Sequence, residues 1–218
     1  MVTFSEENYL KAIYHLSNHG SDSVSTNAIA KRIKTKASSV TDMIKKLADK
    51  DLANYKKYQG VELTELGRKT AVSVIRKHRL WEVFLVNKLG FSWDEVHEVA
   101  EQLEHIRSEK LTNQLDAFLE FPTVDPHGDP IPDRDGNFKK TEKILLSQAN
   151  PDQTYICVGV NDSSTSFLKY LDKHHITLGT QFEVIAKESF DESMVIGIED
   201  HQLTVSKEVA NNLFVKTN

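Results

Sequence analysis

The distribution of proline constrains the fold of this chain more than any other feature. Four of its five prolines lie in the turn-rich run PTVDPHGDPIPDRDGNF, which begins at Pro122. Proline interrupts helices and interior strands, so this run predicts a linker between two differently built parts. Upstream, apolar residues recur at helical spacing; downstream, TYICVGV, TQFEVIAK, SMVIGIED and QLTVS are short β-rich runs, with SSTSFLKYLDKHH as a helix among them. The sequence therefore predicts a mainly α-helical N-terminal two-thirds and a small, barrel-like β domain.

The length of 218 residues predicts two or three modest domains. No apolar run reaches the roughly 18 residues that a membrane span needs, and the start MVTFSEENYLKAIY lacks the basic and then apolar order of a signal peptide. We therefore expect a cytoplasmic protein without membrane contact. The single cysteine, Cys157, lies in an apolar run and is expected to be a buried, unreactive thiol.

Basic residues are concentrated near the N-terminus, although the net charge of the chain is −5. Residues 1–73 carry 12 Lys and Arg against 8 Asp and Glu, and between residues 24 and 60 the numbers are 9 and 3. Such a local positive charge can meet phosphates, while the acidic remainder keeps the protein in solution. A solvated charged face is the simpler alternative.

Two short helices with a turn between them are predicted inside this basic segment. Ser25 can cap the first helix, over residues 26–33. The second helix follows a polar turn, with Val40, Ile44 and Leu47 as its apolar stripe and polar side chains on its free face. This arrangement matches a helix-turn-helix whose second helix enters the major groove of DNA.

A basic β-hairpin is predicted directly after the second helix, in the run LANYKKYQGVELTELG, where a Gln-Gly turn separates two short strands. A pair of capped helices is common in small helical proteins. The ordered combination of helix, turn, polar-faced helix, basic hairpin and local charge favours a winged DNA-binding unit. The residues expected to contact DNA are Thr26, Lys36, Ser38, Ser39, Thr41, Asp42, Lys45, Lys46, Lys57 and Tyr58.

Histidine and glutamate recur at one-turn spacing on two predicted helices that follow the hairpin. They are His78 and Glu82 on the first helix, and His97, Glu101, Glu104 and His105 on the second, each set on one face. Six nitrogen and oxygen donors on two helices suit a divalent cation, because the helices fix their directions and the ion offsets carboxylate repulsion. Each residue taken singly is more simply a solvated or space-filling side chain, but the six together favour a metal site.

Known catalytic patterns are missing from the sequence, which has no HExxH, no paired Glu-x-x-His motifs, no Gly-rich phosphate loop and no Cys cluster. An enzyme is therefore not expected. A metal-independent DNA-binding regulator with a structural metal site stays open as the alternative. The remaining histidines have no role in this interpretation: His15, His19, His127, His174, His175 and His201.

The runs SEENYLKAIYHL, SSVTDMIKKLADKDLANYKKYQGVELTELG, RKHRLWEVFL, VHEVAEQLEHI and DPHGDPIP occur in this order. Together they resemble the diphtheria toxin repressor family of iron- and manganese-dependent regulators, over essentially the whole chain. The resemblance implies a winged helix-turn-helix domain over residues 1–73. It further implies a helical dimerisation and metal-binding domain over 74–140, ending in the proline-rich linker, and a domain similar to SH3 and FeoA-like barrels over 141–218.

The resemblance also implies two metal sites. Its ancillary site matches His78, Glu82 and His97, with Asp162 as a guess for a ligand from the C-terminal domain, and its primary site matches Glu101, Glu104 and His105.

Three positions bear on the choice of metal. Asn8 falls at a further primary position, where iron-type members have Met and manganese-type members have Asp, so that its carbonyl oxygen ligates or Asn8 takes no part. Glu101 stands where iron-type members have Cys, which resembles the manganese type. Lys11 occupies the position of a Glu ligand in one manganese-sensing branch, so the binuclear site of that branch is not expected.

The function implied by the resemblance is repression of metal-homeostasis genes. A homodimer is expected to bind an inverted-repeat DNA operator when Mn(II) or Fe(II) fills one or two sites per subunit. The metal would connect the N-terminal helix bearing Asn8 to the residues Glu101, Glu104 and His105, and so select the conformation that binds DNA.

Overall fold

The structure is a computed structural model that describes residues 1–56 and 59–217. The chain forms two compact units: one comprises Met1–His78, Glu101–Asn113 and Pro132–Asn137, the other Arg79–Ala100, Gln114–Ile131 and Phe138–Asn218. Among the described helices, none is both long and apolar enough to cross a membrane.

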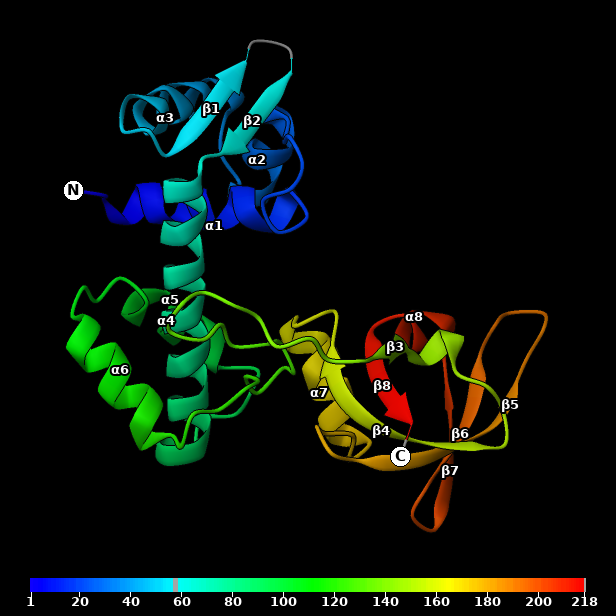
Figure 1. Ribbon diagram of the computed structural model, residues 1–218. Helices are drawn as coiled ribbons and strands as arrows, with labels where there is room; N and C mark the ends of the chain where they lie inside the picture. The colour runs from blue at the N-terminus through cyan, green and yellow to red at the C-terminus, as the bar shows by residue number, and fades with distance from the viewer. Residues whose placement is uncertain (57–58, 218) are drawn as a thin grey trace. The chain divides into compact units, whose positions relative to one another are not determined.

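The N-terminal part of the first unit is a three-helix head with a β-hairpin (Figure 1). Its elements are α1 (Phe4–Leu16), α2 (Thr26–Ile33), α3 (Ala37–Asp49), β1 (Ala53–Lys56) and β2 (Gly60–Leu63), with β1 and β2 paired antiparallel. The predicted Ser25 cap is present, since its hydroxyl oxygen accepts the N–H of Ala28. Val40, Ile44 and Leu47 are fully buried, so the polar face of α3 points outward. The predicted winged helix-turn-helix is confirmed.

Helix α1 is fixed at its N-terminus by a capping box. The Thr3 side chain accepts the N–H of Glu6, and the Glu6 carboxylate accepts the N–H of Thr3. Glu6 is buried and also binds the ammonium of Lys50, with a distance of 2.8 Å between Nζ and Oε1. Since Lys50 ends α3, this ion pair joins α1 to α3.

Three further helices follow the hairpin: α4 (Glu65–Leu89), α5 (Val96–Leu103) and α6 (Glu109–Phe118). The prediction that one helix face carries all four donors from His97 to His105 is wrong, because α5 ends at Leu103. Glu104 and His105 lie in the turn that follows, which the N–H of Ile106 closes by donating to the Leu103 carbonyl at 3.1 Å. This three-residue hydrogen bond tightens the chain and re-aims the last two donors.

The proline-rich run, predicted as a linker, contains two turns that aspartate side chains order. Asp125 is buried and accepts the N–H groups of His127 and Asp129 at 2.8 and 3.0 Å. Asp133 accepts two backbone N–H groups in the same way in a second turn. The four prolines suggested a linker because proline interrupts helices and interior strands, but the aspartate side chains satisfy the backbone and order both turns.

The C-terminal residues form a six-stranded antiparallel sheet in the order β3-β8-β4-β5-β6-β7. Its elements are β3 (Ile144–Leu145), η1 (Leu146–Gln148), β4 (Gln153–Val160), α7 (Thr165–Lys173), β5 (Gln181–Lys187), β6 (Met194–Ile198), β7 (His201–Val205), α8 (Lys207–Ala210) and β8 (Leu213–Thr217). The predicted barrel-like domain is an open sheet and not a closed barrel, because within residues 138–217 the two edge strands, β3 and β7, are not paired with each other. Cys157 is buried as predicted, and burial raises its pKa to about 11.

Candidate functional site

The candidate DNA-reading surface is the free face of α3. Ser38, Ser39, Asp42, Lys45 and Lys46 are exposed there, as predicted.

Three of the other predicted contacts are also described. Lys36, just before α3, is exposed, and Thr26, at the start of α2, is half-buried. Thr41 is half-buried as well, and its hydroxyl donates to the Ala37 carbonyl at 3.0 Å. Lys57 and Tyr58 lie outside the described residues.

A first cluster of metal-ligating side chains consists of Glu82, Asp125 and His127. All three are buried, and one ligand atom from each lies within 4.8 Å of the other two. Nδ1 of His127 is 3.7 Å from Oε2 of Glu82. Carboxylates and imidazole are the donors that Mn(II) and Fe(II) take in proteins, so this cluster has the composition of a divalent-metal site.

Hydrogen bonds orient the side chains of the first cluster. Nε2 of His127 is 2.8 Å from the Trp93 carbonyl oxygen, which can only accept, so the proton of this nitrogen points at Trp93. The other nitrogen, Nδ1, then faces Glu82. Metal-binding histidines are held in this way, with one ring nitrogen donating to a carbonyl and the other free for the ion.

The electrostatics of the first cluster also fit a cation. Burial raises the pKa of Asp125 to about 7, and the charges of Glu82 and Asp129 act in the same direction. Burial alone would lower the pKa of His127, but the hydrogen bond and charge of Glu82, with the charge of Asp125, raise it. A proton or a metal ion would stabilise this buried carboxylate, and Arg79, whose Nε lies 3.5 Å from Oδ2 of Asp125, supplies part of the balancing charge.

The three residues of the predicted ancillary site, His78, Glu82 and His97, also lie together, with one ligand atom from each within 4.8 Å of the other two. Nδ1 of His97, which is about half exposed, lies 3.4 Å from Oε1 of Glu82. His78 precedes Glu82 by one turn on α4 and is buried. Asp162, the guess for a C-terminal ligand, accepts the N–H and hydroxyl of Ser164 and begins the loop before α7.

A second cluster consists of Glu7, His78, Glu101, Glu104 and His105. Nδ1 of His105 lies 2.5 Å from Oε2 of Glu7, and Nδ1 of His78 lies 2.6 Å from Oε2 of Glu104. Glu104 has no exposed side-chain surface, whereas Glu101 is about half exposed. These donors come from α1, α4, α5 and the turn after α5, which the fold brings together although the sequence separates them widely.

Two lysines, Lys11 and Lys77, interact with the carboxylates of the second cluster. Nζ of Lys11 lies 2.7 and 2.8 Å from the two carboxylate oxygens of Glu104, and 3.6 Å from Oε1 of Glu101. Burial would raise the pKa of Glu104, but the hydrogen bond with His78 and the charge of Lys11 bring it below its ordinary value. Burial lowers the pKa of Lys77, and the charges of Glu7 and Glu104 oppose that shift.

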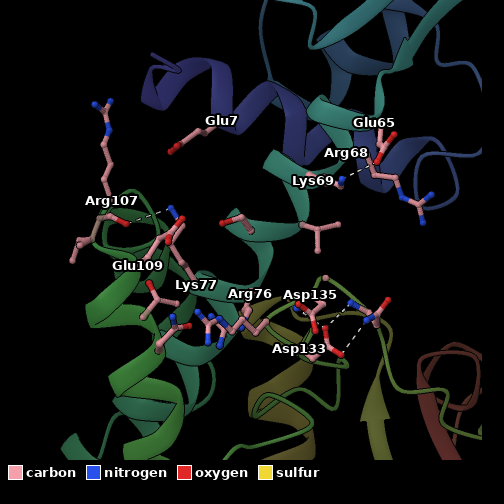
Figure 2. A pocket seen from close by; sticks show the side chains of 18 residues that line it. Glu7, Glu65, Arg68, Lys69, Arg76, Lys77, Arg107, Glu109, Asp133 and Asp135 are labelled. Carbon is pink, nitrogen blue, oxygen red and sulfur yellow. Dashed lines mark hydrogen bonds and ion pairs between the residues drawn. The ribbon is translucent and has the colours of Figure 1, made fainter.

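The same unit contains a pocket of about 790 Å³, and Glu7 and Lys77 are among the residues that line it. Figure 2 shows them with Arg76 and Arg107 among its lining side chains, and with Glu109, Asp133 and Asp135 as further carboxylates. The wall carries both cationic and anionic groups, so the pocket has no single sign of charge.

Comparison with known proteins accounts for this architecture. Family models described as the iron dependent repressor N-terminal DNA-binding domain, the iron dependent repressor metal-binding and dimerisation domain, and the FeoA domain match residues 1–61, 64–133 and 144–217. A solved manganese-dependent transcriptional repressor in complex with manganese is 35% identical, covers 98% of this chain and 100% of that chain, and superposes with a TM-score of 0.85. The chain belongs to the iron-dependent repressor family. The resemblance to the diphtheria toxin repressors is thereby confirmed.

Other members of the family match nearly the whole chain or somewhat more than half of it. The manganese regulator SloR is 35% identical over 98% of both chains, with a TM-score of 0.75. The iron-dependent repressor IdeR of Mycobacterium tuberculosis strain H37Rv is 37% identical over 126 residues, which is 58% of this chain and 54% of that protein. The match thus spans about half the length of this curated relative.

On α1, the residue that contacts the second cluster is Glu7, the neighbour of the Asn8 to which the resemblance pointed. Asn8 is exposed, whereas Glu7 is buried and binds His105. Asp125 and His127 were not assigned by the sequence reasoning at all. The local signal that could have found them is the triplet Asp125-Pro126-His127 in the proline-rich run. It places two donors on either side of a proline, which keeps the chain from becoming helical.

Proposed function

We propose that this protein is a transcriptional repressor that binds an inverted-repeat operator as a homodimer when Mn(II) or Fe(II) is bound. The proposed division of labour follows three domains: residues 1–73 read DNA, residues 74–140 bind metal and dimerise, and residues 141–218 form the FeoA-like domain. An enzymatic role is not proposed.

The observation that carries this proposal is the first cluster. Glu82, Asp125 and His127 are buried together, and burial, with the charges of Glu82 and Asp129, raises the pKa of Asp125 to about 7 although Nε of Arg79 lies 3.5 Å from its Oδ2. A buried carboxylate pair with an imidazole is costly without a cation. His97 is the further candidate donor, since it contacts Glu82 from the more exposed side.

The DNA-binding half of the proposal rests on α3. Its exposed face carries two hydroxyl groups and the ammonium groups of Lys45 and Lys46, and α3 follows α2 in the order of a helix-turn-helix. Lysines supply phosphate contacts, while short polar side chains allow a recognition helix to approach base edges. The names of the related proteins, which are repressors that depend on manganese or iron, agree with this assignment.

The test is DNA binding by the full chain, stripped of metal with a chelator and then titrated anaerobically with Mn(II) and, separately, Fe(II). Selection of operator sequences from random DNA supplies the probe. We expect binding to an inverted repeat to appear as the first cluster fills, with two chains per site. An affinity that is the same in chelator and in excess metal would overturn metal dependence.

A structural role for the metal is the second candidate. Full burial of Glu82, Asp125 and His127 also suits an ion that stays bound and only stabilises the fold. In that case metal removal lowers the unfolding temperature but leaves DNA affinity unchanged in the protein that is still folded. The same titration, followed by circular dichroism, separates the two roles.

A further inference from the structure

The second cluster contains a cation that belongs to the chain itself. We propose that the ammonium group of Lys11 takes the place of a metal ion at Glu101 and Glu104, so that the second cluster is closed without metal. The inference depends on the proposed function only in using Mn(II) as the probe ion.

The geometry of Lys11 is that of a bound cation. Its Nζ lies within 2.8 Å of both carboxylate oxygens of the fully buried Glu104, and its own side chain is 15% exposed. A divalent ion binding Glu104 would need an oxygen contact of about 2.0–2.6 Å. An ammonium and a divalent ion cannot both occupy the same side of one carboxylate, because they repel each other in a site with little water.

The charges of the second cluster are already nearly balanced. Glu7, Glu101 and Glu104 supply three carboxylates, while Lys11 and Lys77 supply two ammonium groups that interact with them. Adding a divalent ion would therefore give this region an excess of positive charge. In the first cluster the cationic group is Arg79, whose Nε lies 3.5 Å from Oδ2 of Asp125, a longer contact than the two that Lys11 makes with Glu104. The two clusters thus differ in how tightly a cation of the chain holds the carboxylates.

The remaining donors of the second cluster are also engaged. His105 binds Glu7 at 2.5 Å, and His78 binds the same Glu104 carboxylate that Lys11 holds. On α1, the exposed Asn8 adds no charge to the cluster. The carboxylates that would attract an ion are thus neutralised by Lys11, while the imidazoles are held by carboxylates.

The consequence is that α1 is held to residues 101–105 by an ion pair at all metal concentrations. Metal dependence then enters through the first cluster, and the second cluster fixes one arrangement of α1 permanently. Neutralising Lys11 should convert the second cluster into a metal site, because it would leave the carboxylates of Glu101 and Glu104 and the imidazoles in place without their cation.

Metal stoichiometry of the full chain tests this inference without any DNA. Chelator-stripped wild type, Lys11→Met and Lys11→Arg are dialysed against Mn(II), and bound metal is measured per chain, with circular dichroism to confirm folding. Lys11→Met should gain one ion per chain over the wild type, whereas Lys11→Arg, which keeps the charge, should gain none. Lys50→Met is the matched control, since Lys50 also binds a buried glutamate on α1, Glu6.

Glu104→Gln, introduced into Lys11→Met and into the wild type, shows whether the gained ion binds at Glu104. In Lys11→Met it should abolish the gained ion, and in the wild type it should leave the number of bound ions unchanged. Loss of an ion from the wild type on Glu104→Gln, or equal ion numbers in folded Lys11→Met and wild type, would overturn the inference. A wild type that binds no Mn(II) would refute the first cluster as a metal site, yet the gain in Lys11→Met would still test Lys11.

Discussion

Nδ1 of His127 lies 3.7 Å from Oε2 of Glu82, and both side chains are buried. This pair joins the middle of α4 to a turn in the proline-rich run. It places an imidazole nitrogen and a carboxylate oxygen where one ion can contact both, and Asp125 completes the set. Metal affinity should therefore depend on α4 and on this turn together.

Glu82→Gln should weaken Mn(II) binding at least about tenfold, which corresponds to about 1.4 kcal/mol. The amide keeps the size of the side chain but removes the charge that attracts the ion. Isothermal titration of the full chain measures the effect. Glu98→Gln, at an exposed position on α5, is the control and should bind as the wild type does. Equal dissociation constants for Glu82→Gln and Glu98→Gln would remove Glu82 from the site.

Mn(II) affinity should rise with pH up to about 7 and level off above it. Asp125, whose pKa is raised to about 7, holds a proton in the metal-free protein at lower pH, and the ion must displace this proton. Below the pKa the affinity should change by up to about tenfold per pH unit. Asp125→Asn should bind weakly with a shallower dependence. Asp133→Asn, in the second aspartate turn, should keep the wild-type slope; a slope shared by all three proteins would exclude Asp125 as the titrating group.

The stability of the metal-free protein should fall as the pH rises from about 4 to about 7. Asp125 has a higher pKa in the folded chain than the ordinary 3.8, so the folded state binds more protons over this range and loses its advantage as they dissociate. Urea unfolding in chelator at pH 5 and 7.5 measures the change. Asp125→Asn should lose less stability than the wild type over the same interval, by about 1 kcal/mol or more. The idea fails if the two proteins change in parallel.

Lys45→Ala or Lys46→Ala should weaken binding to operator and random DNA alike. A lost phosphate contact reduces the slope of log affinity against log salt by about 0.9. The fold should be unaffected, because Lys45 is exposed and its ion pair with Asp42, at 3.8 Å, is a surface pair of little energetic value. Lys173→Ala, at the end of α7, serves as the exposed-lysine control. An unchanged salt slope in both α3 variants would argue against phosphate contacts.

Local periodicity predicted the parts of this fold that depend on neighbours along the chain. The α3 stripe of Val40, Ile44 and Leu47 and the Ser25 cap were found because helical geometry fixes which residues share a face. The i, i+4 spacing of His78 and Glu82 on α4 was found for the same reason.

Long-range packing decided what periodicity could not. The pairing of Glu82 with His127 depends on where the proline-rich turn lies, and nothing in the spacing of either segment fixes that. Which residue of α1 faces His105 depends on the rotation of α1 about its axis. Glu7 and Asn8 are neighbours in the sequence, but in a helix of 3.6 residues per turn their side chains point about 100° apart, and it is Glu7 that contacts His105. Closure of the C-terminal sheet likewise depends on pairing between distant strands.

Gly128→Ala should damage the fold and the metal site together. Gly128 has a φ of +83°, and a Cβ there would lie 2.1 Å from the Val158 carbonyl oxygen, which is backbone and cannot easily move. The same contact is anchored by the Val160 N–H, which donates to the His127 carbonyl at 2.9 Å. The side chain added by the substitution would therefore push the turn, and His127 with it, away from β4.

Gly179→Ala is the matched control for this substitution. Gly179 has a φ of +91°, but a Cβ there meets no atom within 4 Å, so only the cost of the left-handed backbone, about 1–2 kcal/mol, should appear. Gly128→Ala should lose about 2 kcal/mol more than this in urea unfolding and should bind Mn(II) at least about tenfold more weakly, while Gly179→Ala keeps wild-type affinity. Equal losses of stability, with Mn(II) binding intact in both, would mean that the turn yields to the clash and that its close approach to β4 does not position His127.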